Sequence, residues 1–231
     1  MRSLTPPCHG TLRAVPHYPL IVRVTHWCMA LTILVMIGSG WRIYNREPVV
    51  DFISSFPVWA TLGGERSHSQ AINNDGGFAN ALMWHFSAMW LLIANFGLYV
   101  VHGLVSRRFW SLWLPVTPGA ISRDAIAAVT FRLEHRPGRC NAVQKVLYIF
   151  VVFAILMTIV SGAAIWKPVQ LWWLTVWFGG FERARLVHFL CMAGIVLFIA
   201  VHVLMALLVP RTIRAMITGR TTAPVPGGTA L

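Results

Sequence analysis

Four long stretches of this chain contain no charged side chain, and they constrain its fold more than any other feature. Each is close to the roughly 20 residues that a helix needs to cross the hydrocarbon core of a bilayer. They cover residues 24–41, 81–105, 146–166 and 186–210. The sequence therefore predicts an all-α integral membrane four-helix bundle, with spans at about 22–43, 81–105, 145–166 and 185–210.

The composition excludes other classes of protein. Hydrophobic residues make up 57% of the 231 residues and charged residues only 11%, and the mean hydropathy is +0.65. Soluble domains carry about a quarter charged residues, and disordered chains lack such apolar content. The net charge of +12 is spread over too few side chains for a nucleic-acid groove, so no nucleic-acid partner is expected and the charge indicates a lipid bilayer with anionic lipid.

The positive charges predict the orientation of the bundle. The two tails and the 106–145 connection hold 13 Lys and Arg against two acids, whereas the other two connections hold six against five acids. The positive side of a membrane protein is cytoplasmic. We expect a cytoplasmic N-terminal tail at 1–21, a membrane domain at 22–210 and a cytoplasmic C-terminal tail at 211–231, with the loops at 43–80 and 167–184 outside.

Two further segments suit the membrane surface. The segment 168–181 is too short to span, and its Trp172, Trp173 and Trp177 are typical of an interfacial position. In the inner connection, Pro118 predicts the start of an amphipathic interfacial helix.

Five of the nine histidines fall within the spans, where ionisable side chains are costly and usually functional. His26 and His202 lie near the inner ends of their spans, and His85 and His188 near the outer ends. His188 and His202 are 14 residues apart, which is about 40° short of four full turns and a rise of about 21 Å, so both face one side of the last span. His102 is about 100° out of phase with His85 and does not belong to the same stack.

Paired imidazoles in a dry bundle favour haem over zinc, because zinc commonly takes four protein ligands whereas haem needs two axial ones. Gly38, Gly40 and Gly162 would let a macrocycle approach the backbone, or would serve helix packing. Arg23, one turn before His26, suits a haem propionate or a plain positive-inside anchor. The chain has no C-x-x-C-H motif, so the haem would be held noncovalently.

Several motifs in order along the chain resemble those of the bacterial four-helix dihaem cytochromes b. This family includes bacterial cytochrome b561, the cytochrome b subunit of nickel–iron hydrogenase and the gamma subunit of formate dehydrogenase. The motifs are RVTHW at 23–27, SG at 39–40, NAVQK at 141–145, ARLVHF at 184–189 and the histidine at 202. The similarity covers about residues 18–220, and the layout is closest to the thiosulfate-reductase-type cytochrome b subunits that accompany molybdopterin enzymes.

The resemblance implies two haem b groups. Their iron ligands would be His26 with His202 on the inner side and His85 with His188 on the outer side, in agreement with the depth argument. It also implies a quinone near the inner haem, with Asn141 as the contacting residue.

Three further residues have more than one expected role. Gln144 and Lys145 are adjacent candidates for the quinone site, and Lys145 would serve equally as an interfacial anchor. His102 would contact a propionate, relay protons to quinone or remain a structural histidine.

The implied function is electron transfer in a respiratory chain of the bacterial inner (plasma) membrane. The chain would be the electron-transfer subunit of an oxidoreductase complex, linking a periplasmic molybdopterin or cytochrome c partner to the quinone pool. The 43–80 loop is a candidate docking platform, or a cover over the outer haem.

Two rival functions differ in their partners. In the first, the chain alone passes electrons from a small periplasmic reductant such as superoxide to quinone, aided by a positive rim of Arg66, Lys167, Arg183 and Arg185. In the second, the histidines carry ions or protons without redox chemistry. The near absence of Asp and Glu from the spans argues against this second rival.

Overall fold

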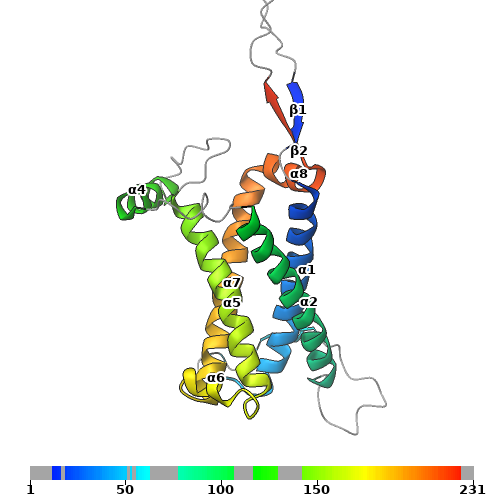
Figure 1. Cartoon of the computed structure of the whole chain (residues 1–231), viewed down its shortest axis with the longest axis vertical. Coiled ribbons are helices and arrows are strands. Elements are labelled where there is room, and N and C mark those ends of the chain that lie inside the picture. Colours follow the sequence, from blue (N-terminus) through cyan, green and yellow to red (C-terminus); the bar gives the residue numbers. More distant parts are fainter. Residues whose placement is uncertain are drawn as a thin grey trace, which may run out of the picture.

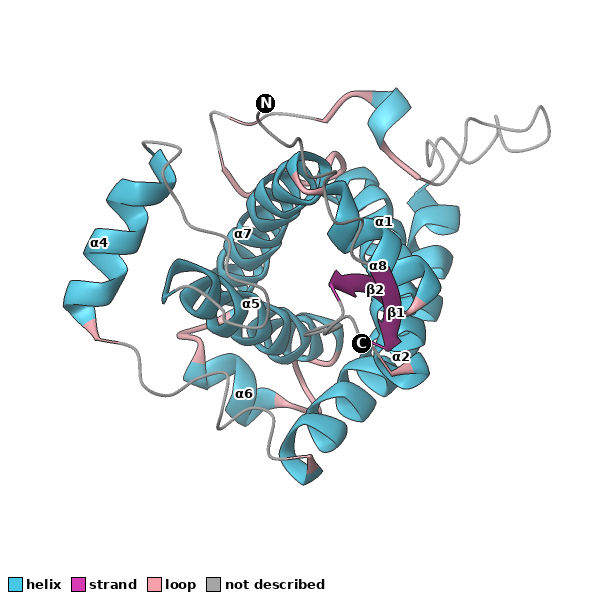
Figure 2. Cartoon of the chain, turned by 90° about the horizontal axis from the view of Figure 1, so that it is seen from above, coloured by secondary structure: helices cyan, strands magenta, loops and turns pink. Residues whose placement is uncertain are grey.

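The structure is a computed structural model that describes residues 12–16, 19–50, 53, 56–62, 78–106, 117–129 and 142–224. Four long helices dominate it: α1 (Leu20–Tyr44), α2 (Phe78–Val105), α5 (Ala142–Trp166) and α7 (Phe181–Leu208). Most helix packing occurs within two pairs, α1 with α2 and α5 with α7. Figures 1 and 2 show these pairs arranged around a common bundle axis.

The predicted four-span, helical membrane architecture is confirmed, since all four helices are long and apolar enough to cross a membrane. Each helix begins two to four residues before its predicted start. The last span ends two residues earlier than expected, at Leu208. Pro210 explains this end, because the residue before a proline is disfavoured in helical conformation and the next helix begins at the proline itself.

Apolar side chains face both outward and inward on these helices. Large residues such as Leu31, Leu34, Trp90 and Leu197 are exposed on the outer surface, as expected for contact with lipid. A buried cluster from α2, α5 and α7 forms the middle of the bundle: Leu92, Phe96, Ala154, Ile155 and Ile195.

Short helices lie at the two ends of the bundle. Figure 1 shows α4 (Pro118–Val129) across the bundle axis at one end and α6 (Trp172–Trp177) at the other. These are the loops in which interfacial helices are predicted. Trp172, Trp173 and Trp177 are all exposed, as suits an aromatic belt at the membrane surface.

The sequence pattern does not predict the elements that follow α7 or precede α1. Helix α8 (Pro210–Thr218) leads through Gly219, whose φ of 75° is left-handed, into strand β2 (Arg220–Pro224). Strand β2 pairs antiparallel with β1 (Leu12–Pro16), with Leu12 opposite Pro224. The segments next to both termini therefore form one two-stranded ribbon beyond the bundle (Figures 1 and 2).

Two side chains of α1 attach α8 to the bundle. The Arg23 guanidinium donates hydrogen bonds to the backbone carbonyls of Met216, at 3.2 Å, and Ile217. The Trp27 indole N–H also points to the Met216 carbonyl, at 3.4 Å. These donors satisfy carbonyls at the end of α8 that have no partner within the helix.

At the opposite end, the loop after α1 folds back onto that helix through side-chain and backbone bonds. The Tyr44 hydroxyl donates to the Ile53 carbonyl at 2.7 Å. The Asn45 amide makes two bonds with the backbone of Phe56, at 2.8 and 2.6 Å. Beyond the short helix η1 (Val58–Ala60), the Leu62 N–H donates to the Gly38 carbonyl at 2.8 Å.

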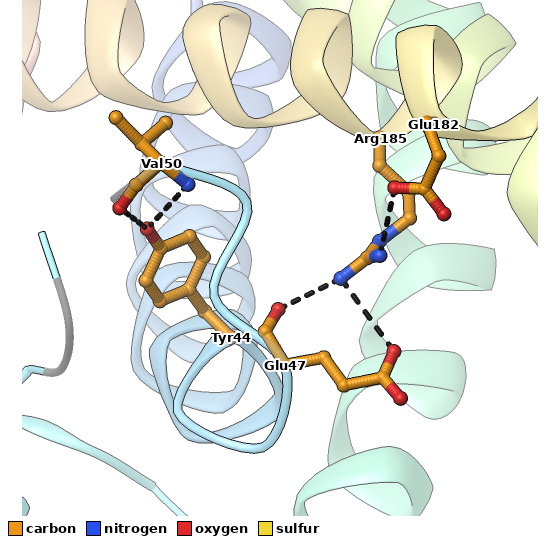
Figure 3. A network of polar contacts seen from close by, with 5 residues as sticks. All are labelled: Tyr44, Glu47, Val50, Glu182 and Arg185. Carbon is orange, nitrogen blue, oxygen red and sulfur yellow. Dashed lines mark hydrogen bonds and ion pairs between the residues drawn. The ribbon is translucent and has the colours of Figure 1, made fainter.

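An arginine from α7 holds the same loop from the other side of the bundle. Figure 3 shows the Arg185 guanidinium between Glu47 and Glu182. It donates to the Glu47 backbone carbonyl at 2.7 Å and to the Glu182 carboxylate at 3.0 Å, and its contact with the Glu47 carboxylate is 3.7 Å. The loop is thus fastened to the first and last spans.

The two ends of the bundle should differ in access from the cell exterior. The test starts from a variant in which serine replaces all four native cysteines. One cysteine is then introduced at either Glu47 or Arg214, both of which are exposed. A membrane-impermeant maleimide should label the cysteine at 47 in intact spheroplasts, and the cysteine at 214 only after permeabilisation, because the positive end is cytoplasmic. The reverse labelling pattern would invert the proposed topology.

Candidate functional site

His85 and His188 meet across the bundle near the end that carries α6. His85 projects from the second turn of α2 and His188 from the second turn of α7. Their ring centroids are 6.4 Å apart, with ring planes at 63°. The outer pair predicted from depth along the spans is therefore brought together in space.

Each ring of this outer pair is anchored through its Nδ1 atom to the neighbouring helix. His188 Nδ1 lies 3.0 Å from the Thr158 carbonyl and 3.2 Å from the Ser161 hydroxyl. His85 Nδ1 lies 3.0 Å from the Ser39 hydroxyl.

These contacts fix which nitrogen carries the proton. A carbonyl oxygen only accepts, so the Nδ1 atom of His188 must donate to Thr158. The Ser39 and Ser161 hydroxyls each donate to a backbone carbonyl of their own helix, at 2.7 and 2.6 Å, and so accept from the imidazoles. In both rings Nε2 is left with its lone pair, which is the state a metal requires.

Two glycines lie against these rings, and Gly162 makes room for its ring. A Cβ atom at Gly162 would lie 3.1 Å from His188 Cε1, and one at Gly40 would lie 3.5 Å from His85 Cε1. The contact at Gly162 is tighter than van der Waals contact allows. Gly38, in contrast, faces Leu62 of the outer loop. The described contacts of Gly40 and Gly162 are thus with the histidines, whereas the sequence suggested close approach of a macrocycle or helix packing.

His26 and His202 form a second pair toward the end that carries α8. Their ring centroids are 6.1 Å apart, with planes at 52°. The His202 ring stacks on Phe198 at 5.5 Å, and the His26 ring meets Trp27 edge-on at 5.4 Å. Among the described residues, the buried Nδ1 atom of His26 finds no hydrogen-bond partner.

Both pairs fit the two axial positions of a haem. Two imidazole–metal bonds of about 2.0–2.1 Å place the ring centres roughly 6–6.5 Å apart once the half-width of each ring is added. The observed separations of 6.1 and 6.4 Å fall in this range. Within the described ranges no three His, Cys, Asp or Glu side chains gather as a metal site, so each pair offers two protein ligands, which suits a macrocycle that brings its own four nitrogens.

Four other predicted residues that the structure describes lie near the inner end of the bundle: Arg23, His102, Gln144 and Lys145. Arg23 is engaged by the α8 carbonyls. Gln144 and Lys145 are half-buried in the first turn of α5, and His102 is half-buried in the last turn of α2. Asn141 lies outside the described residues.

Ser39, Ser161 and Thr158 are site residues to which the sequence assigns no role. Ser39 and Ser161 are completely buried. The detectable signal is the Ser-Gly motif shared by residues 39–40 and 161–162. A motif of two residues does not reveal that each hydroxyl faces a histidine on another helix.

Comparisons with known proteins agree with this geometry. The sequence profile of the family described as prokaryotic cytochrome b561 matches residues 17–219. A relative from Azospira oryzae is 38% identical over 203 residues, which cover 87% of this chain and 96% of the relative. That protein is named putative protein-methionine-sulfoxide reductase subunit YedZ1. The chain therefore belongs to the prokaryotic cytochrome b561 family, whose members are bacterial membrane proteins that hold haem b.

Proposed function

We propose that this chain is the membrane subunit of a periplasmic reductase and passes electrons from quinol to that reductase through two b-type haems. The observation that carries the proposal is the presence of two facing histidine pairs at two depths of one bundle. Haem b bound at these pairs would supply the one-electron redox chemistry.

The spacing of the pairs suits transfer across the membrane. His188 and His202 on α7 are separated by about 21 Å along the helix axis, out of a hydrocarbon core of about 30 Å. The buried apolar cluster around Leu92, Phe96 and Ile195 fills the bundle between these levels. The chain's own contribution is ligation, spacing and a dry environment.

The direction of transfer and the partner rest on the relative's name. A reductase that converts methionine sulfoxide to methionine and water consumes two electrons and two protons. Oxidation of one quinol to quinone releases two of each, so the two half-reactions balance. We infer a molybdopterin-dependent partner, because the layout also resembles the cytochrome b subunits that accompany such enzymes.

The inner end of the bundle is the proposed quinone site. Asn141 matches the family's quinone-contacting asparagine, and Gln144 and Lys145 lie in the first turn of α5. His102 lies near the inner end of α2 and would relay protons from this side. Arg23 donates a hydrogen bond to a backbone carbonyl of α8 in the structure. A second role, as the partner of a haem propionate, is part of this proposal.

The outer surface gives less support to direct use of superoxide. The positive rim expected there includes Arg185, which is paired with Glu47 and Glu182. The Lys167 ammonium lies over the Trp166 ring, at 5.0 Å. Acidic partners reduce the net positive field that would steer an anion, so a protein is preferred over superoxide as the periplasmic redox partner.

Substitution of one ligand should remove one haem. His202→Ala should abolish the inner haem and retain the outer one, and His85→Ala should do the reverse, because a pair with one imidazole holds its haem with a single axial bond. The haem-to-protein ratio of each purified variant should fall from two to one. Ala substitution of Gln170, which is exposed in the turn before α6, serves as the control and should retain two. A ratio of two in either histidine variant would contradict the pairing.

The partner is tested by reoxidation in reconstituted vesicles. The tagged chain, reduced with a quinol analogue, should be reoxidised by methionine sulfoxide only after the co-purified periplasmic subunit is added. If the isolated chain reduces quinone with superoxide and no outer subunit co-purifies, the stand-alone oxidoreductase is the correct function instead.

A further inference from the structure

We infer that Ser39 and Ser161 are positioning residues that orient the outer pair, His85 and His188, and lower the midpoint potential of the haem between them relative to the inner haem. This inference rests on the proposed function, because it assumes a haem at each pair. It assigns to two buried hydroxyls a role that the family match does not specify.

The hydroxyls form a directional relay at each ring. His85 Nδ1–H donates to Ser39 Oγ, and Ser39 Oγ–H donates to the Val35 carbonyl, with heavy-atom distances of 3.0 and 2.7 Å. On the other side, His188 Nδ1–H is shared between the Thr158 carbonyl, at 3.0 Å, and Ser161 Oγ, at 3.2 Å, and Ser161 Oγ–H donates to the Met157 carbonyl at 2.6 Å. Successive hydrogen bonds of one direction polarise and strengthen one another.

The two relays are built alike in two different helix pairs. In each, the serine is followed by a glycine that seats the same imidazole, Gly40 under His85 and Gly162 under His188. At His188, the carbonyl of Thr158, three residues before the serine, also bonds the ring. Repetition of the whole arrangement argues that it serves the histidines rather than helix packing alone.

The inner pair has a different environment. The buried His26 Nδ1 has no partner among the described residues, and His202 is held by stacking on Phe198. A hydrogen bond from the distal ring N–H makes a metal-bound imidazole more basic and fixes its orientation. A more basic ligand stabilises the oxidised metal, so the outer haem should have the lower midpoint potential of the two.

The relay is compatible with outward electron transfer. Electrons that leave the inner side move with the field when the cell interior is negative. A lower potential at the outer haem then stores part of that field energy in the reduced outer centre.

The experiment is a redox titration of purified Ser39→Ala, Ser161→Ala and the double variant. Each single substitution should raise the midpoint of the outer haem, the double variant should raise it further, and the inner midpoint should stay unchanged. Loss of a distal partner weakens metal binding about 10- to 100-fold. Apparent haem affinity at the outer site should therefore fall by up to that factor in Ser39→Ala and by less in Ser161→Ala, because the Thr158 carbonyl still accepts from His188. The low-spin ferric EPR signal of the outer haem should shift, because it reports the relative orientation of the imidazole planes.

The matched control is Thr32→Ala. Thr32 lies on the same helix as Ser39, is buried, and donates to the Cys28 carbonyl of its own helix at the same 2.7 Å distance. Both midpoints and both EPR signals should remain as in the wild type. Equal shifts in this variant would attribute the effect to helix packing.

Unchanged outer midpoints in the serine variants that bind two haems, or a shift confined to the inner haem, would overturn the inference and leave the proposed function intact. If Ser39→Ala does not fold, Ser161→Ala tests the same haem from the other ligand.

Independently of both serines, the haem retained by His202→Ala should titrate at the lower of the two wild-type midpoints, and the higher value would refute the assignment. Absence of haem from the wild-type chain would instead refute the proposed function.

Discussion

The meeting of imidazoles from opposite helix pairs is the interaction on which this bundle depends. Polar ring nitrogens within a membrane are costly unless they find partners. Packing between helices is concentrated within α1 with α2 and within α5 with α7, whereas His85 with His188 and His26 with His202 each join one helix pair to the other. A group bound between two such rings would bridge the halves as well as carry electrons.

The two ends of the bundle are closed by different means. On the outer side, Tyr44 and Arg185 fasten the loop after α1, and the Tyr44 ring stacks at 4.9 Å on Phe189, the neighbour of His188. On the inner side, Arg23 ties α8 to the start of α1. The outer end thus carries a loop held at several points, and the inner end carries a short helix and a ribbon.

The sequence predicts the spans and the pairing of the histidines because both follow from simple periodicity. Charge-free length defines the four helices, and depth with helical phase brings His85 to His188 and His26 to His202. The contacts that decide the chemistry of each ring are not accessible in this way. Whether Ser39 faces His85, or Arg23 faces α8, depends on the rotation of one helix against another, which no local pattern encodes.

Other features of the structure are not predicted by the sequence pattern, for a related reason. Strand β1 and strand β2 lie at opposite ends of the chain, and their pairing arises only after the bundle brings both segments to the same end. Gly40 and Gly162 are recognisable as sites of close approach, but the approaching group is an imidazole in the described contacts. Asn141 lies outside the described residues, so its proposed place near quinone rests on the resemblance.

The central claim is that one chain holds two b-type haems between two histidine pairs. The most direct measurement is the reduced-minus-oxidised spectrum of the purified wild-type protein together with haem quantitation after acid–acetone extraction. The account predicts two extractable haems per chain. A chain that is fully folded and carries one haem, or none, would contradict it.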